Sequence, residues 1–265
     1  MPSTEQPQSP VEDDASDESG QNASAPRICF LHIPKCGGTT IDRALSRHYA
    51  ADQQVRMHAH GSFAAAKAAG QSLMDYRHDQ VPLMLSTPGG RYVCGHFPFN
   101  EAAHERFRDQ WKFITLLREP VSRWFSEYFY NRHSPGGHFS TELDLETYVA
   151  QAGPSTAFSG KLTHATALSS SEDRVQAAIS TLERLDAVGC LEQLDEFQHQ
   201  LETLLGAELE VGHDRRNPLP VEKQKKTVTP AIRRRVEELC AEDTEIYEHA
   251  QQIARRVRGG ARSQG

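Results

Sequence analysis

The stretch FLHIPKCGGTTIDRAL, residues 30–45, places a lysine just before a pair of glycines and a pair of threonines. An apolar run precedes the glycines and an amphipathic segment follows them, which predicts a strand, a loop and a helix. In such a unit the loop N–H groups and the positive end of the helix dipole stabilise an anion. Gly37 and Gly38 let the backbone approach a ligand without a Cβ in the way. Lys35 adds an ammonium group, so these residues predict a cradle for a terminal anionic group.

The order of residues in this loop differs from that of an ATP-binding loop. The ATP-type pattern G-x-x-x-x-G-K-[ST] places its lysine after the glycines. Here Lys35 precedes them, and no glycine stands four residues before Gly37. The pattern therefore disfavours a magnesium-dependent kinase or NTPase, which we keep as an alternative. Thr39 and Thr40 supply hydroxyl donors and could cap the helix that follows, expected at about 40–49.

A second candidate anion site lies in LLREPVSRWFSEY, residues 116–128. The apolar run 111–118 predicts a strand that ends at Arg118, whose planar guanidinium suits a phosphate. Pro120 is placed well for the first turn of a following helix. Ser126 would add a neutral donor from that helix, and Arg123 could assist from the same helix.

A candidate general base lies between these two segments. His96 stands in YVCGHF, residues 92–97, within a predicted strand over 91–97. An imidazole with a pKa near its ordinary value of about 6.5 can take a proton from a hydroxyl group at neutral pH. His96 is one of 13 histidines, so its position between the two motifs carries the assignment.

The remaining pattern predicts strands that alternate with helices. Further strands are expected at 27–33 and 186–193, and residues 50–90 show little periodicity beyond an Ala-rich patch that could be helical, Ala64 to Ala69. Further helices are expected at 121–133, 144–153, 171–185 with Ser171 as cap and 194–205 with Gly206 beyond its end, and one or two more over 230–257. This alternation predicts an α/β fold with a central parallel sheet and helices on both faces.

Four segments of the chain resemble PAPS-dependent sulfotransferases, which use 3′-phosphoadenosine 5′-phosphosulfate (PAPS). HIPKCGGTT resembles the 5′-phosphosulfate loop of that family, particularly of its carbohydrate group, which includes the heparan sulfate 2-O-sulfotransferases. LLREPVSRWFSEY is similar to the 3′-phosphate segment, and YVCGHF to the strand whose Gly-His ends in the catalytic base. Residues 217–250 look like the C-terminal segment, with a Lys-Thr step followed by helices. The likeness spans roughly residues 27–250.

The resemblance implies a fold, a reaction and a set of roles. The fold would be P-loop NTPase-like and three-layered, and the reaction an in-line transfer of a sulfuryl group from PAPS to a hydroxyl-bearing acceptor, a glycan or small molecule, without a metal. His96 would be the base, and Lys35 would neutralise the leaving 5′-phosphate. The residues implied in cofactor binding are Pro34, Lys35, Cys36, Gly37, Gly38, Thr39, Thr40, Arg118, Ser126, Arg123, Lys225, Lys226 and Thr227.

Two departures from the family pattern limit what can be carried over. Cys36 stands where Thr or Ser is common, and a thiol is a poorer donor, so contact there would come from the backbone N–H. Residues 50–90 and 131–170, where an acceptor would lie, match nothing in the family residue by residue. The identity of the acceptor therefore stays open.

Composition and charge limit the classes of partner and the domain organisation that the chain could have. Residues 1–26 hold six of the 36 acidic residues and no Lys or Arg, which leaves 30 acidic against 29 basic residues in the remainder. That balance gives no support for nucleic-acid binding. We expect a disordered acidic tail over 1–26, a single domain over 27–257 and a flexible end over 258–265. No apolar run suggests a membrane span, so we expect a cytoplasmic protein, as a monomer or oligomer.

Two further readings of the sequence stay open at this point. The chain could be a non-catalytic nucleotide-binding relative, although Lys35, His96, Arg118 and Ser126 are all retained. It could also be a cysteine enzyme that uses Cys94 or Cys36 with a histidine. The five cysteines form no CxxC pair, and no HExxH motif occurs, so a metal site is not expected.

Overall fold

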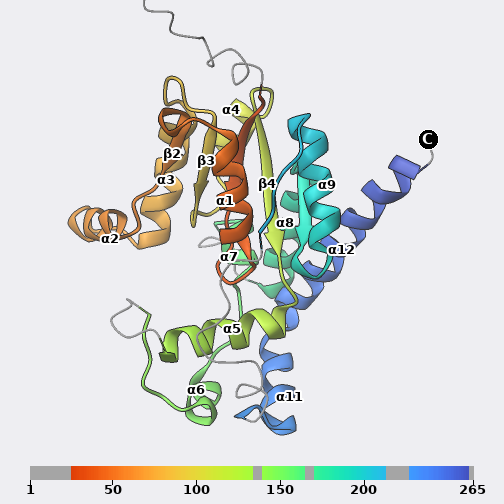
Figure 1. The fold of residues 1–265 in the computed structure, drawn as a ribbon. Helices are drawn as coiled ribbons and strands as arrows, with labels where there is room; N and C mark the ends of the chain where they lie inside the picture. Colours follow the sequence, from red (N-terminus) through yellow and green to blue (C-terminus); the bar gives the residue numbers. More distant parts are fainter. Residues whose placement is uncertain (1–24, 134–138, 165–169, 213–226, 263–265) are drawn as a thin grey trace, which may run out of the picture.

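The computed structural model describes residues 25–133, 139–164, 170–212 and 227–262, with side chains up to residue 256 (Figure 1). Its centre is a parallel sheet with strand order β2-β3-β1-β4-β5. The strands are β1 (Arg27–Leu31), β2 (Gln54–Arg56), β3 (Tyr92–Gly95), β4 (Trp111–Leu117) and β5 (Ala187–Cys190). The predicted α/β class with a central parallel sheet is confirmed.

The strand register brings the ends of three strands together. Leu31 of β1 pairs with Gly95 of β3 on one side and with Thr115 of β4 on the other. In a parallel sheet the carboxyl ends of neighbouring strands lie at one edge, which is where α/β proteins bind ligands. The residues that follow β1, β3 and β4 therefore share one edge of the sheet.

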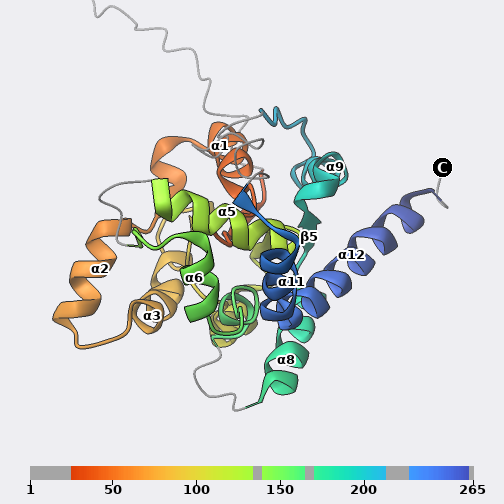
Figure 2. The same ribbon diagram turned by 90° about the horizontal axis from the view of Figure 1, so that it is seen from below.

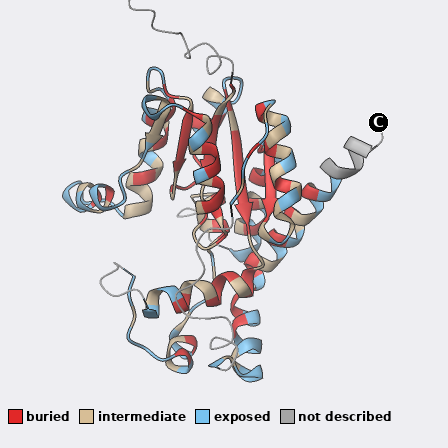
Figure 3. Ribbon diagram, in the orientation of Figure 1, coloured by how far each residue is buried: buried red, intermediate tan, exposed pale blue. Residues whose placement is uncertain are grey.

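Helices cover both faces of the sheet (Figures 1 and 2). Alternate residues of β1 point to opposite sides: Ile28 and Phe30 belong to one buried cluster, and Cys29 and Leu31 to the other. The first cluster includes residues of α1 (Gly38–His48) and α9 (Leu194–Leu205). The second includes residues of α3 (Leu73–Leu85), α4 (Glu101–Phe107), α7 (Ser159–Leu162), α8 (Ser171–Arg184) and α12 (Ala241–Arg262). The sheet is thus the buried middle layer of three (Figure 3).

A third apolar cluster lies beyond the carboxyl edge of the sheet, at the lower end of Figure 1. It joins α5 (Pro120–His133), α6 (Leu145–Gln151) and α11 (Pro230–Leu239). Trp124 and Tyr128 of α5 pack against Tyr148 of α6 with ring centroids 5.5 Å and 5.0 Å apart. This cluster fixes α5 below the turn that follows β1.

Three local predictions need correction. The first helix begins at Gly38 rather than 40, and its N-cap is Gly37, so neither Thr39 nor Thr40 caps it. The helix over 171–184 is capped by Ser170, whose hydroxyl accepts from Asp173 N, and not by Ser171. The strand expected at 186–193 ends at Cys190, because residues 191–193 turn into a 3-10 helix.

Residues 50–90, which show little periodicity, contain more helix and strand than the sequence indicates. This segment holds β2, α2 (Ala59–Ala68) and α3, of which only part of α2 was expected. A three-residue edge strand is too short for a pattern, and α3 carries Pro82 and apolar residues around much of its circumference. Tertiary contact with the sheet therefore decides these elements.

Two further expectations concern the ends of the chain, a flexible segment at 258–265 and an acidic tail at 1–26. Helix α12 runs to Arg262, so it enters the segment 258–265 that we expected to be flexible. Most of the expected acidic tail lies outside the described residues. None of the helices in the described ranges combines the length and the apolar character that a membrane crossing needs.

Candidate active site

The turn between β1 and α1 is tightly wound. Lys35 and Gly37 both adopt left-handed backbone conformations, with φ of 67° and 80°. The conformation of Gly37 favours glycine, and a Cβ there would lie 2.6 Å from Leu191 Cδ1, so the Leu191 side chain would have to shift. No side-chain hydrogen bond caps the N-terminus of α1, and its first turn contains no acidic residue. The positive end of this helix dipole is not offset by a capping carboxylate.

Gly38 is required for a different reason, the ring of His32. A Cβ at Gly38 would lie 2.3 Å from His32 Cδ2. The His32 ring stacks on Phe30, with centroids 5.3 Å apart and an interplanar angle of 4°. The adjacent glycines thus let the loop close against Leu191 on one side and His32 on the other.

Lys35 and Arg118 are brought into direct contact. The Arg118 guanidinium, just beyond β4, donates from Nη1 to the Lys35 carbonyl oxygen at 3.3 Å. The contact uses only one of the five N–H donors of the guanidinium. The Lys35 ammonium lies 3.5 Å from the ring centroid of Tyr130 on α5. The two segments that were predicted to bind anions therefore lie in contact at this edge of the sheet.

Helix α5 presents one face to the loop. Tyr130 contacts Lys35, and Ser126 lies one turn earlier on the same side of the helix. Ser126 is half-buried and makes interactions of its own. The opposite side of α5, with Trp124 and Tyr128, forms part of the third apolar cluster. Ser126 is thus placed on the side of α5 that faces Lys35.

The N-terminus of α5 is closed by the residue that precedes it. The Glu119 carboxylate accepts from Val121 N at 3.0 Å and from Ser122 N at 2.8 Å. Glu119 was not among the predicted site residues, although an acidic residue directly before a proline is a recognisable helix-start signal. Its negative charge satisfies backbone N–H groups that could otherwise bind an anion.

Arg123 and Cys36 lie behind the loop. Arg123 is buried, with 3% of its side chain exposed, and pairs with Glu127 at 2.9 Å. The Cys36 thiol is fully buried, and its burial raises the pKa to about 12 although Arg123 and Arg118 lie close enough to oppose this. The Cys36 side chain therefore packs inward as a neutral group, and Arg123 lies close enough to affect its pKa.

His96 follows β3 and is held by the turn after β1. Its Nδ1 lies 2.6 Å from the His32 carbonyl oxygen. A carbonyl oxygen only accepts, so Nδ1 carries the proton and, in the neutral ring, Nε2 has the lone pair. Burial lowers the pKa of His96, and the nearby Lys161 and Arg77 lower it further. The imidazole is therefore neutral at pH 7 and has one atom able to accept a proton.

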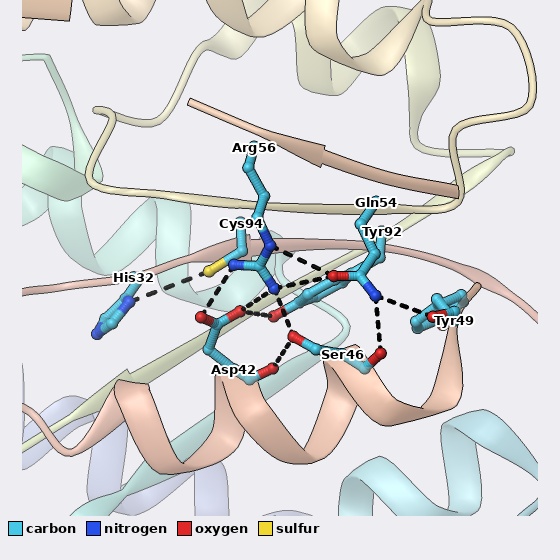
Figure 4. Close-up of polar contacts among 8 residues, drawn as sticks. All are labelled: His32, Asp42, Ser46, Tyr49, Gln54, Arg56, Tyr92 and Cys94. Atoms are coloured by element: carbon cyan, nitrogen blue, oxygen red, sulfur yellow. Dashed lines mark hydrogen bonds and ion pairs between the residues drawn. The ribbon is translucent and has the colours of Figure 1, made fainter. Parts of the chain in front are cut away.

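The His32 ring lies 4.4 Å from the His96 ring between centroids, and on its other side His32 and Cys94 adjoin a polar cluster around Asp42 of α1 (Figure 4). The Asp42 carboxylate accepts from the Tyr92 hydroxyl at 2.8 Å and pairs with Arg56 at 3.0 Å. Cys94 Sγ lies 4.0 Å from His32 Nδ1. Burial lowers the pKa of His32 to about 3, and His96 contributes to the decrease. His32 therefore stays neutral across the physiological range.

The same cluster argues against the cysteine-enzyme alternative. Burial and the neighbouring Asp42 carboxylate raise the pKa of the Cys94 thiol well above its usual value. The thiolate is the nucleophilic form of cysteine, and it is disfavoured in such surroundings. Cys36 is disfavoured for the same reason.

The other predicted residues are placed as follows. Thr40 is buried, while Thr39 and Pro34 are half-buried in the loop. Lys225 and Lys226 lie outside the described residues. Thr227 is exposed and lines a cavity of about 340 Å³ beside α5 and α6, together with Arg132 and Asp144.

Two cations beside His96 were missed by sequence reasoning. Lys161 of α7 and Arg77 of α3 both contact the His96 main chain. Neither belongs to a motif, and each is more than 15 residues from His96 along the chain, so no sequence signal marked them. Within the described ranges no cluster of three or more His, Cys, Asp or Glu residues is arranged to hold a metal ion.

Comparisons with known proteins gave distant likenesses among solved structures alone. No protein-family model matches the chain, and no curated protein sequence does. Among solved structures, the crystal structure of the mouse sulfotransferase SULT7A1 complexed with PAP is similar, with a TM-score of 0.47 and 14% sequence identity. The match covers 82% of this chain and 84% of that chain.

Proposed function

We propose that this protein is a sulfotransferase that moves a sulfuryl group from PAPS to a hydroxyl group. The observation that carries the proposal is the hydrogen bond from Arg118 Nη1 to the Lys35 carbonyl at 3.3 Å. It joins two segments, 83 residues apart in sequence, that each resemble one half of a PAPS site. Their contact supports a single ligand with an anionic group at each end.

The residues of the site fit such a ligand chemically. The uncapped N-terminus of α1 and the Lys35 ammonium offer positive charge for the phosphosulfate end. Arg118 would hold the 3′-phosphate through its remaining N–H donors, with the Ser126 hydroxyl as a neutral partner. Gly37 and Gly38 let the loop adopt this conformation against Leu191 and His32, with its backbone N–H groups available to the ligand. We propose that Arg123 supports this loop and is not itself a ligand-binding residue, because it is buried and paired with Glu127.

The reaction needs one proton acceptor, and His96 is suited to that role. A bond forms between sulfur and the acceptor oxygen, and the bond between sulfur and the 5′-phosphate oxygen breaks. The acceptor proton passes to Nε2 of His96, because Nδ1 is held by the His32 carbonyl. Adenosine 3′,5′-bisphosphate leaves, and Lys35 neutralises the charge on its 5′-phosphate. A positioned base of this kind typically contributes about 10²- to 10⁴-fold in rate.

The sequence resemblance is the ground for our proposal of an acceptor class. That resemblance favours a carbohydrate hydroxyl over other alcohols, and a glycan or a small sugar derivative is the first class to test. We also propose that Lys225, Lys226 and Thr227 close over the nucleotide. We also propose a location in the cytoplasm, as expected from the sequence.

Calorimetric titration of the whole chain tests the nucleotide part. Adenosine 3′,5′-bisphosphate should bind more tightly than adenosine 5′-monophosphate, because only the former reaches both Lys35 and Arg118. ATP with Mg²⁺ should bind more weakly than the bisphosphate. Tighter binding of ATP with Mg²⁺ would instead support the kinase alternative and overturn this proposal.

Turnover with ³⁵S-labelled PAPS and a panel of hydroxyl acceptors tests the chemical part. The His96→Gln variant should bind adenosine 3′,5′-bisphosphate as the wild type does and lose transfer. Lys35→Ala should lose both. Stabilisation by PAPS without transfer to any acceptor would support the non-catalytic alternative.

A further inference from the structure

We propose that Lys161 is a positioning residue that fixes the main chain at His96 and keeps its imidazole neutral by direct charge. The structural part of this inference follows from the contacts of Lys161 and does not depend on what the protein catalyses. Its consequence for catalysis rests on the proposed function, in which neutral His96 accepts the proton of the acceptor.

Two cations meet on the carbonyl oxygen of His96. Lys161 Nζ lies 3.2 Å from that oxygen and Arg77 Nη1 lies 3.3 Å from it. On the other side of the same residue, the Nδ1–H of the ring donates to the His32 carbonyl at 2.6 Å. His96 is therefore held at both its ring and its main chain. Any sideways movement of Nε2 has to break at least one of these hydrogen bonds.

Lys161 is itself anchored, so it can act as a fixed point. Its carbonyl oxygen accepts from Phe99 N at 2.7 Å, three residues after His96. The start of α7 is tied to α12 by Asp243, which accepts from Phe158 N at 2.9 Å and from the Ser155 hydroxyl at 2.5 Å. The ammonium group thus reaches His96 from a short helix that is bound to the body of the protein.

The charges around His96 are unequal. Lys161 and Arg77 face it from α7 and α3, and the neutral His32 ring lies 4.4 Å away between ring centroids. Asp42 on α1 is the acidic group that opposes them, but it is engaged by Arg56. In the described part of the chain, neither Lys161 nor Arg77 forms an ion pair with a carboxylate. The balance of positive charge disfavours a second proton on the imidazole.

The protonation state of Lys161 at pH 7 is consistent with this role. Burial, with help from Arg77, lowers the pKa of Lys161 to about 8. The ammonium is therefore still mostly protonated at pH 7 and exerts its charge on His96. Met74 Sδ and the His96 carbonyl, its contacts on α3 and after β3, are both uncharged.

Histidine titration by NMR tests the proposal directly, because it requires neither PAPS nor an acceptor. The His96 ring resonance is assigned by its loss in His96→Gln, and its pKa is followed in the whole chain. Lys161→Met keeps much of the side-chain length and removes the charge, so the His96 pKa should rise by about 0.5 pH unit or more. Lys161→Arg keeps the charge and should leave the pKa near its wild-type value. Lys67→Met, an exposed lysine on α2, controls for net charge.

The outcomes separate this inference from the proposed function. An unchanged His96 pKa in Lys161→Met, or an equal rise in Lys67→Met, overturns the role of Lys161 whatever the protein catalyses. If Lys161→Met does not fold, the wild-type protein still decides: the ¹³Cε resonance of Lys161 should titrate near pH 8. Titration of Lys161 above pH 10 would place it in solvent and refute the proposal. Once an acceptor is identified, the apparent pKa on the acid side of the pH profile of kcat/KM should rise in Lys161→Met together with the His96 pKa.

Discussion

The β1–α1 and β4–α5 turns lie side by side at one edge of the sheet, yet they treat their helix ends in opposite ways. The N-terminus of α1 has glycine at its cap, no side-chain cap and no acid in its first turn. The N-terminus of α5 is covered by the Glu119 carboxylate, which accepts from Val121 N and Ser122 N. Only the first turn therefore offers its helix dipole to an anion.

Under the proposed function, this difference would keep the two anion sites distinct. The first turn would bind through backbone N–H groups that lie in a fixed loop, with Lys35 as the added charge. The second would bind through side chains, Arg118 and Ser126, because its own backbone is already satisfied. A larger residue at Gly37 or Gly38 should thus harm the first turn, and removal of the Arg118 side chain should harm the second.

Gly38→Ala should have the largest effect. The new Cβ would meet the His32 ring at 2.3 Å, and that ring is confined by Phe30 and His96. We expect binding of adenosine 3′,5′-bisphosphate to fall by about 100-fold or more, since the cost of overpacking is about 1–3 kcal/mol in addition to lost loop geometry. Calorimetry measures the binding. Gly160→Ala is the control, because a Cβ there meets no atom within 4 Å, and it should bind normally.

Arg118→Ala should weaken the same ligand by about 10- to 100-fold, since one hydrogen-bonded charge pair contributes about 1.5–3 kcal/mol. Binding of adenosine 5′-monophosphate, which lacks the 3′-phosphate, should change much less. Comparing the two ligands by calorimetry isolates the second turn. Equal losses for both ligands would mean that Arg118 acts only through its contact with the Lys35 carbonyl.

His32 should make the stability of the protein depend on acid pH. Its folded-state pKa of about 3 lies below the unfolded value of about 6.5, so as pH falls between these values only the unfolded state takes up the proton. The free energy of unfolding should therefore decrease by about 1.4 kcal/mol per pH unit from this group. Urea unfolding at several pH values between 4 and 6 should show a flatter dependence in His32→Asn. His199→Asn, at an exposed position, should keep the wild-type slope.

Glu119→Ala should have the smallest effect and the most specific one. Loss of the cap should lower the free energy of unfolding by about 0.5–2 kcal/mol. Affinity for adenosine 3′,5′-bisphosphate should stay the same or increase, because a negative charge next to Arg118 is removed. Urea unfolding and calorimetry measure the two quantities. A marked loss of affinity would show that the second turn also needs its capped helix end to bind.

Much of the framework of the candidate site was predictable because its strands and helices carry strong local signals. The apolar runs predicted as strands at 27–33 and 111–118, with glycines or a proline beyond them, indicate strand–turn–helix units and form β1 and β4. Gly206 ends α9 in a left-handed conformation as expected, since glycine adopts it without a steric cost. The cap of α1 was predicted wrongly, because Thr39 and Thr40 look like caps only until the loop is seen to wind through Gly37.

The sequence alone therefore determined the parallel α/β arrangement and the motif residues that end its strands, because hydrophobic periodicity and glycine or proline positions act over a few residues. The tertiary structure alone decided the contact between Arg118 and Lys35, the burial of Arg123 and the convergence of Lys161 and Arg77 on His96. The contacts of Arg118 with Lys35 and of Lys161 and Arg77 with His96 join residues 19 to 83 positions apart. Their partners are set by strand register and helix packing, which depend on the whole folded chain.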